Sequence, residues 1–228
     1  MRTVLIIGGS KGIGNAILSS QLELNNKVYN ISRSAPPNNH PNLTHYDCDI
    51  LTDELPDFES IDTLIYCPGS VNLKPISTLT IDDFRTDFEI NVIGAVKTIK
   101  KYLKPLKNGK NTSILLFSTV ATKLGMPYHA SIAASKSAIE GLTKSLGAEL
   151  APAIRVNAIA PTVTDTDLVS KILRNDKMKE VIAEKHPLKR YLAPSDVAAL
   201  ADFLISENSS AMSGQIFNLD CGIVTFKL

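Results

Sequence analysis

The stretch "TVLIIGGSKGIGNAILSSQLEL", residues 3–24, decides the fold. Its first five residues are β-branched or aliphatic, as in a buried strand, and its last ten show the spacing of an amphipathic helix. Glycines at positions 8, 12 and 14 join the two, allowing a tight turn, close approach of a phosphate to the backbone, and packing of the helix on the strand. The N–H groups that begin the helix then offer donors to anionic oxygen. This order predicts a phosphate-binding loop, with a merely tight strand-to-helix turn as the weaker alternative.

Beyond this unit, short β-branched runs alternate with longer segments of helical period, which predicts a parallel sheet covered by helices. We expect strands at Thr3–Ile7, Lys27–Ile31, Leu43–Cys48, Thr63–Tyr66, Ser113–Phe117, Arg155–Ile159 and Ile216–Leu219. Helices are expected over residues 13–24, 81–104, 131–150, 166–185 and 195–206.

Two of the connections are too short for a normal crossover helix. The link "SRSAPPNNHPN", residues 32–42, contains three prolines, and "ILTDELPDFES", residues 50–60, is interrupted by Pro56. Because proline removes a backbone donor and breaks helices, we expect the helices around the third strand to be shortened or missing.

Composition excludes several classes of protein. The 228 residues carry 24 Lys plus Arg against 23 Asp plus Glu, so charge gives no reason to expect nucleic acid or an anionic membrane as partner. Three widely spaced cysteines suggest neither a disulfide framework nor a metal site and fit a reducing cytoplasm. No segment approaches the length of apolar chain that a membrane span needs.

The spacing Gly-x-x-x-Gly-Ile-Gly at residues 8–14 resembles the cofactor loop of the short-chain dehydrogenase/reductase family, and the likeness continues along nearly the whole chain. The resemblance implies a single Rossmann-type α/β domain over residues 1–228, with a doubly wound parallel sheet of about seven strands and helices on both faces. It also implies a nicotinamide cofactor, a small carbonyl or alcohol substrate, and assembly as a homodimer or homotetramer. One departure is Ile7, where the family usually has Thr.

The second strand indicates which nicotinamide cofactor is bound. In "VYNISRS", Ser32 and Arg33 stand where NAD-binding members carry an acid, and Lys11 matches a second cation of NADP-dependent members. An arginine can grip a 2′-phosphate that an acid would repel. The sequence therefore predicts NADP(H).

The resemblance also supplies the remaining cofactor contacts. Asp49 and Ile50 match residues that hold the adenine, and in "YCPGS", residues 66–70, only Gly69 survives of the family's Asn-Asn-Ala-Gly. Tyr66 and Pro68 are expected to alter the wall that meets the adenosine ribose. The full predicted set is Gly8, Ser10, Lys11, Gly12, Ile13, Gly14, Ser32, Arg33, Asp49, Ile50, Gly69, Asn91, Lys136, Pro161, Thr164 and Thr166.

Carbonyl reduction needs a proton donor for the developing alkoxide and groups that hold the oxygen and cofactor. The family uses Asn, Ser, Tyr and Lys. Here the resemblance assigns Asn91 to the first, Thr119 to the serine position, and Lys136 to the lysine. The tyrosine position is Ile132, whose aliphatic side chain has no exchangeable proton. The chain is thus predicted to be an atypical member that lacks the family's general acid.

Two replacements for the missing acid remain open: His129 reaching inward, or a water relayed by Lys136 and Thr119. Against both stands the simpler interpretation of His129 as a loop or subunit-contact residue. A further departure is Thr162, in place of a glycine beside the nicotinamide. The sequence therefore leaves two functions: an NADP(H)-dependent oxidoreductase with a degenerate proton-donor site, or a catalytically silent NADP(H)-binding homologue acting as sensor, scaffold or partner subunit.

Overall fold

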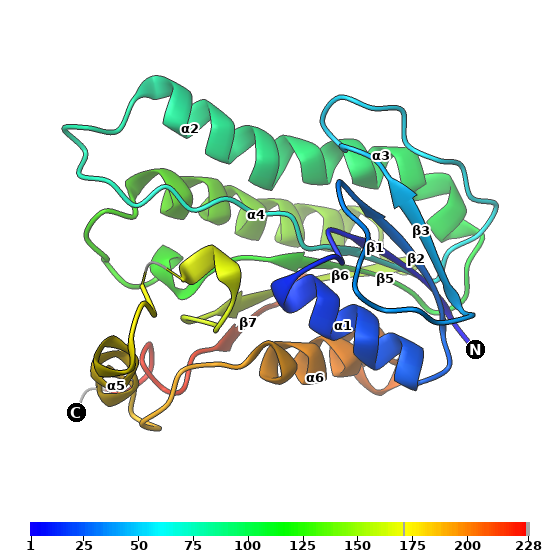
Figure 1. The fold of residues 1–228 in the computed structure, drawn as a ribbon. Coiled ribbons are helices and arrows are strands. Elements are labelled where there is room, and N and C mark those ends of the chain that lie inside the picture. The colour runs from blue at the N-terminus through cyan, green and yellow to red at the C-terminus, as the bar shows by residue number, and fades with distance from the viewer. Residues whose placement is uncertain (171, 227–228) are drawn as a thin grey trace.

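A computed structural model describes residues 1–170 and 172–226 and contains a seven-stranded parallel sheet in the order β3-β2-β1-β4-β5-β6-β7 (Figure 1). The predicted doubly wound α/β fold is confirmed. Each predicted strand appears, with ends within two residues of those expected. The strands are β1 Thr3–Ile7, β2 Lys27–Ser32, β3 Leu43–Asp47, β4 Thr63–Tyr66, β5 Thr112–Phe117, β6 Ile154–Pro161 and β7 Ile216–Leu219.

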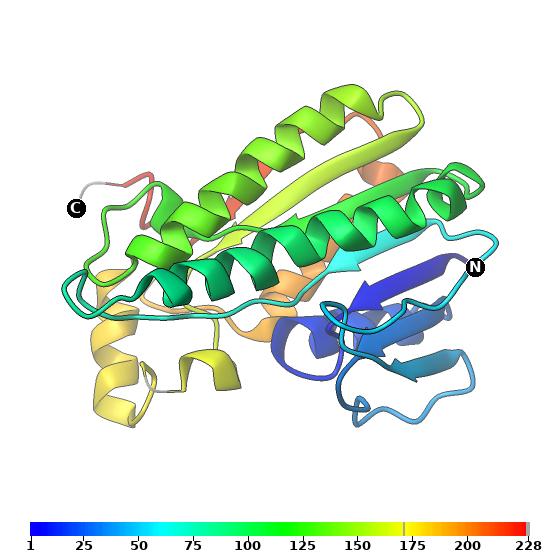
Figure 2. The ribbon, with the colours of Figure 1, turned by 90° about the horizontal axis from the view of Figure 1, so that it is seen from above.

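Helices cover both faces of this sheet, as Figures 1 and 2 show. One face carries α1 (Gly12–Glu23) and α6 (Pro194–Ile205), and their apolar sides pack on β1, β4 and β5. The other carries α4 (Ala130–Glu149) and a continuous rod formed by α2 (Ile81–Phe88), a π-helical turn η1 (Glu89–Ile93) and α3 (Gly94–Lys107). Because helices cover both faces of the sheet, the side chains on both sides of its central strands are buried, and these strands are almost wholly hydrophobic.

The predicted helix over residues 166–185 is wrong in its first half. A short 3₁₀ turn, η3 (Asp167–Val169), is followed by α5 (Asp176–Lys185), and residue 171 lies outside the described residues. Asn175 has extended backbone and its side chain accepts from the backbone N–H of Met178. That N-cap starts a new helix, so the signal "ND" at 175–176 outweighs the apolar period before it.

Cover near β3 is thin, as predicted. Residues 33–42 and 48–62 contain no helix. An aromatic cluster fills the gap on one face, where the rings of Tyr29 and Phe58 lie 4.5 Å apart and Phe58 also contacts Tyr46 and Tyr102. Aromatic burial therefore replaces a crossover helix at this edge.

The strand order reverses between β1 and β4. From β1 the sheet extends to one side through β2 and β3, and from β4 it extends to the other side through β5, β6 and β7. In an open parallel sheet, such a switch point leaves a crevice outside the carboxyl ends of the strands. The topology therefore places a binding site where Gly8 and Gly69 follow β1 and β4.

Candidate cofactor pocket and reaction centre

A cavity of about 540 Å³ opens at this switch point, within the usual size range of small-molecule sites. It is lined by the segments that follow β1, β2, β3 and β4 and by the turn that contains η3. Most of the predicted cofactor residues line it: Gly8, Ser10, Lys11, Gly12, Ile13, Gly14, Ser32, Arg33, Asp49, Ile50, Gly69 and Thr166. The structure thus brings together side chains that lie far apart in the sequence.

The glycine loop has the geometry that phosphate binding requires. Gly8 has a φ of +79°, and a Cβ on Gly14 would overlap the carbonyl oxygen of Gly8. The N-cap of α1 is Lys11, whose side chain makes no capping bond, and the first turn of α1 contains no acidic residue. No side chain therefore caps the positive end of α1 where it meets the cavity, and its N–H groups remain available to an anion.

The far end of the cavity carries the predicted determinants of cofactor type. The side chain of Arg33 is 80% exposed, and its Nη1 lies 4.0 Å from Oδ2 of Asp49. Ser32 is buried, where its hydroxyl accepts from Asn30 and donates to the carbonyl of Ser34. The guanidinium is consequently free to move toward a ligand, whereas the serine hydroxyl is already engaged.

The wall formed by "YCPGS" differs from expectation. Cys67 and Pro68 line the cavity, but Tyr66 does not. Its hydroxyl instead donates to the carbonyl of Ile90 at 2.6 Å, on the opposite face of the sheet. Strand alternation explains the difference, because neighbouring residues of β4 point to opposite faces. The same alternation would have identified Cys67, which sequence analysis missed.

Lys136 occupies the interior behind this wall. It is 9% exposed, and its Nζ donates to the backbone carbonyl of Phe117 at 2.9 Å. Burial lowers the pKa of the ammonium group to about 8, an effect that the neighbouring Cys67 and Asp87 partly oppose. A buried lysine of this kind is poised to bind or exchange a proton near neutral pH.

Asn91 lies beside this lysine, on the π-helical turn η1. A Cβ added to Gly69 would lie 3.4 Å from Asn91 Oδ1 and 3.7 Å from Lys136 Nζ, so the three residues meet at one point. The Asn91 amide nitrogen donates to the carbonyl of Asp87 at 2.7 Å and to the hydroxyl of Ser70 at 3.0 Å. Its Oδ1 is buried without a hydrogen-bond partner. Short π-helical turns are common at functional sites, and here one sets an amide against a buried cation.

None of the residues assigned to catalysis lines the cavity, and this includes Asn91 and Lys136, which are also predicted cofactor contacts. The hydroxyl of Thr119 accepts from the backbone N–H of Ala121 and begins the 3₁₀ turn η2 (Val120–Thr122). His129 is half-buried at the start of α4, where its Nδ1 bonds the carbonyl of Pro127. Ile132 is buried, at 4% exposure, one turn before Lys136. None of these three residues places a proton donor in the cavity.

The segment after β6 holds the remaining predicted contacts. Pro161 ends β6, and Thr164 is buried with its hydroxyl bonded to the carbonyl of Thr162. Neither lines the cavity, whereas Thr166 does. Thr162 is also buried, and its Oγ1 lies 2.8 Å from Nε2 of His186, at the end of α5. Its β-branched side chain thus connects the sheet to a helix, a role that its position in the sequence did not predict.

Comparison with known proteins finds relatives along nearly the full chain. A family profile described as enoyl-(acyl carrier protein) reductase matches residues 48–224. A curated protein of Rickettsia prowazekii (strain Madrid E), named 3-oxoacyl-[acyl-carrier-protein] reductase FabG, is 30% identical over 235 aligned residues, which cover 98% of this chain and 97% of that protein. The chain belongs to the short-chain dehydrogenase/reductase family. This family of oxidoreductases accounts for the phosphate loop and the strand order described above.

Solved structures of the short-chain dehydrogenase/reductase family superpose on almost every residue. The ligand-free aldohexose dehydrogenase of Thermoplasma acidophilum has a TM-score of 0.91 and 26% identity, covering 99% of this chain and 95% of its own. A structure of ElxO with NADP bound has a TM-score of 0.90 and 25% identity, covering 99% and 100%. Both show that the described fold is that of the family.

Within residues 1–170 and 172–226, no cluster of three or more His, Cys, Asp or Glu side chains is arranged to hold a metal ion. None of the helices in this part of the chain combines the length and apolarity needed to cross a membrane.

Proposed function

We propose that this chain binds NADP(H). Support comes from one observation above all: the uncapped amino end of α1 and the glycine loop open into a cavity that also receives Lys11 and Arg33. The helix end and loop suit a pyrophosphate, and the two cations suit the additional 2′-phosphate that distinguishes NADP(H) from NAD(H). Asp49, at the same rim, would accept from the adenine amine.

Arg33 is the residue on which the choice of cofactor rests. Its only ionic contact within the described residues is the long one to Asp49, and a 2′-phosphate offers a better partner for the guanidinium fork. Hydrogen bonds to charged groups contribute about 1.5–3 kcal/mol, which corresponds to roughly a 10- to 150-fold preference for NADPH. Titration of intrinsic NADPH and NADH fluorescence measures that preference directly.

The test compares the parent protein with Arg33→Ala and, as a matched control, Arg174→Ala, which changes an exposed arginine outside the cavity. We expect Arg33→Ala to weaken NADPH binding and leave NADH binding unchanged, and the control to change neither. Equal affinity of the parent for the two cofactors, or an unchanged preference in Arg33→Ala, would refute the assignment.

We further propose that the protein is an NADP(H)-dependent oxidoreductase for carbonyl or alcohol substrates with a degenerate proton-donor site. When bound, the nicotinamide would supply or accept the hydride. Lys136 would hold the cofactor ribose, Asn91 would orient the lysine, and Thr119 would steady the substrate oxygen. Because a curated relative is named a 3-oxoacyl-[acyl-carrier-protein] reductase, 3-oxoacyl thioesters belong in the first substrate panel.

A second function is favoured by Ile132. If this buried side chain occupies the position of the family tyrosine, no phenol protonates the alkoxide, and His129 turns its Nδ1 to a backbone carbonyl. Losing a general acid typically slows a reaction about 10²–10⁴-fold. The chain would then bind NADP(H) as a sensor, scaffold or partner subunit. Absence of NADPH oxidation across the panel, together with tight NADPH binding, would select this alternative.

Assembly as a homodimer or homotetramer forms part of the proposal. Phe88 and Ile93 are each 42% exposed on the outer side of the α2–η1–α3 rod, where burial against a second copy would remove apolar surface from water. Sedimentation equilibrium measures the state directly, and a monomer at micromolar concentration would contradict this part.

A further inference from the structure

A buried carboxylate that catalysis has not yet explained lies one helical turn before Asn91. Asp87, near the end of α2, has no exposed surface. One of its oxygens accepts from the Ser70 hydroxyl at 2.5 Å and from the Asn72 amide at 2.9 Å. The other accepts from the Ser131 hydroxyl at 2.6 Å. An isolated buried carboxylate is very costly, so these three donors are what make its burial possible.

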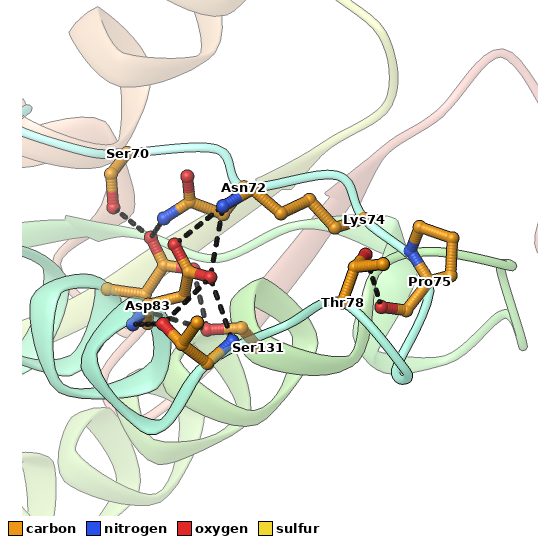
Figure 3. A network of polar contacts seen from close by, with 9 residues as sticks. Ser70, Asn72, Lys74, Pro75, Thr78, Asp83 and Ser131 are labelled. Carbon is orange, nitrogen blue, oxygen red and sulfur yellow. Dashed lines mark hydrogen bonds and ion pairs between the residues drawn. The ribbon is translucent and has the colours of Figure 1, made fainter.

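The three donors come from separate parts of the chain. Ser70 and Asn72 lie on the loop after β4, and Ser131 lies on the first turn of α4; Figure 3 shows them converging on one network. Asp87 therefore fixes two elements to α2 at the level of the reaction centre. The carboxylate of a second aspartate, Asp83, holds Lys74 of the same loop by bonds of 2.9 and 3.0 Å, and its backbone carbonyl lies 3.5 Å from the Ser131 hydroxyl.

The chemistry of the network gives it a direction. An ionised carboxylate can only accept hydrogen bonds, so the Ser70 hydroxyl must donate its one proton to Asp87. The lone pairs of Ser70 then accept from the amide nitrogen of Asn91 at 3.0 Å. The second amide proton of Asn91 goes to the backbone carbonyl of Asp87, which is also only an acceptor. Both N–H donors of the Asn91 side-chain amide are thus used on the side that faces Ser70 and the Asp87 carbonyl.

The amide oxygen consequently points to the other side. Asn91 Oδ1 is buried, has no hydrogen-bond partner, and faces the point that Lys136 Nζ also approaches. A neutral residue in place of Asp87 would remove the part of this direction that runs through Ser70, since an amide at position 87 could donate to Ser70, and Ser70 could then donate to Asn91 Oδ1. The backbone carbonyl of residue 87 would be the one acceptor left to hold the Asn91 N–H₂ group, and the amide could more easily turn over and present that group to the ammonium.

We propose that Asp87, acting through Ser70, is a positioning residue that turns the Asn91 amide oxygen toward Lys136. The orientation of the Asn91 amide is a property of the chain alone. That this orientation serves cofactor-dependent chemistry rests on the proposed function. The amide oxygen stabilises the charged lysine, as does the negative charge of Asp87, against the burial that lowers its pKa. Cys67 is the other titratable group acting on this lysine.

The test uses the full chain without cofactor and three variants. Asp87→Asn keeps the shape of the side chain and removes the acceptor-only end, and Ser70→Ala removes the relay while keeping the carboxylate. Ser131→Ala is the matched control, because it deletes the same kind of hydroxyl from the same aspartate on the branch that does not lead to Asn91. Thermal melts report whether each variant folds.

Two signals from nuclear magnetic resonance report orientation rather than stability. The first is the side-chain amide resonance pair of Asn91, assigned by its loss in Asn91→Asp. The second is the titration of the Lys136 ¹³Cε resonance, assigned by its loss in Lys136→Met. We expect Asp87→Asn and Ser70→Ala to move the Asn91 pair by more than a linewidth and to lower the Lys136 midpoint below its value of about 8. Ser131→Ala should leave both signals in place.

The outcomes separate this inference from the proposed function. If Ser70→Ala folds and both signals match the parent, the positioning role is refuted, whether or not NADPH binds. Equal responses in Ser70→Ala and Ser131→Ala would also refute it, because they would show general loosening. If the signals move as expected while the parent fails to bind NADPH, the positioning role stands and the proposed function fails. Should Asp87→Asn not fold, Ser70→Ala decides alone.

Discussion

The cavity beside α1 and the region around Lys136 rest on the same seven-stranded sheet but are built on different principles. The cavity relies on backbone: glycine conformations, the free N–H groups of a helix end, and the carboxyl ends of four strands. The region around Lys136 relies on individual side chains, each held by specific hydrogen bonds. A site made of main chain tolerates changes of sequence that a site made of side chains does not.

This contrast explains where the departures from the family pattern fall. Replacing side chains along "YCPGS" leaves a cavity wall with Cys67 and Pro68 in place of the usual residues. By comparison, if Ile132 occupies the position of the family tyrosine, this one aliphatic side chain removes the proton donor that carbonyl reduction needs. Binding and catalysis can therefore be lost separately, and four experiments test how far they have been.

The largest expected effect comes from restoring the phenol. Ile132→Tyr should raise NADPH-dependent reduction of a reactive carbonyl by about 10²–10⁴-fold, because it adds a general acid one turn before Lys136. Steady-state rates of NADPH oxidation check this, and Ile132→Phe supplies the ring without the hydroxyl. Strong turnover in the parent that Ile132→Tyr does not change but His129→Ala abolishes would show that the acid has moved to the histidine.

A change in the backbone of the glycine loop should weaken cofactor binding in the cavity. Gly14→Ala places a Cβ on the carbonyl oxygen of Gly8, which cannot move without opening the loop. We expect a loss of about 1–3 kcal/mol in the free energy of unfolding and at least a tenfold weaker NADPH affinity. Urea denaturation and fluorescence titration measure the two quantities. Unchanged NADPH binding in this variant would show that the phosphates lie elsewhere.

The buried lysine should give a dependence of stability on pH. Its pKa of about 8 in the folded protein is below the ordinary 10.5, so the unfolded chain binds more protons between these values and stability due to Lys136 rises as pH rises through that window. Below pH 8 the full cost of burial applies. Lys136→Met should therefore be more stable than the parent at pH 7 by roughly 1–3 kcal/mol, with a difference that shrinks toward pH 10.5.

Urea denaturation of both proteins at several pH values measures this difference and cancels groups that titrate in both. A constant difference from pH 7 to 10.5 would mean that the lysine is hydrated in solution.

The smallest effect is a gain. Gly141, inside α4, has open space where a Cβ would stand, so Gly141→Ala should stabilise the protein by about 0.5–1 kcal/mol and leave NADPH affinity unchanged. It makes the same chemical change as Gly14→Ala in another helix and is the control for it. A loss of stability would reveal a contact on this face of α4, such as a second copy in solution.

Sequence reasoning predicted the backbone-built part well, for a physical reason. Strand and helix periods together with Gly8, Gly12 and Gly14 fix the sheet and the cavity, because these signals are local. Arg33 and Asp49, which the sequence predicts as cofactor contacts, both line the cavity, since Arg33 directly follows β2 and Asp49 lies two residues after the end of β3. The split of residues 166–185 was missed because the N-cap of Asn175 competes with an apolar period that continues past it.

The hydrogen-bond network around Asp87 could not be predicted from the sequence. Asp87, Ser70 and Ser131 come from three elements, and each alone reads as a surface polar residue of a helix or loop. The packing of α2 against α4 buries Asp87 and Ser131, and the half-buried Ser70 joins them from the loop after β4. Tyr66 was misplaced for a simpler reason, since the alternation of β4 already assigns it to the face opposite Cys67.

The bond between Thr162 and His186 has a mechanical consequence. The imidazole is held on both sides, with Nδ1 on the carbonyl of Ile182 and Nε2 on the threonine hydroxyl, so the carboxyl end of α5 is tied to the end of β6. The amino end, at Asn175, has no such tether to the sheet among its described hydrogen bonds. Any rotation of α5 relative to the sheet would therefore pivot at His186 and displace the amino end of the helix furthest.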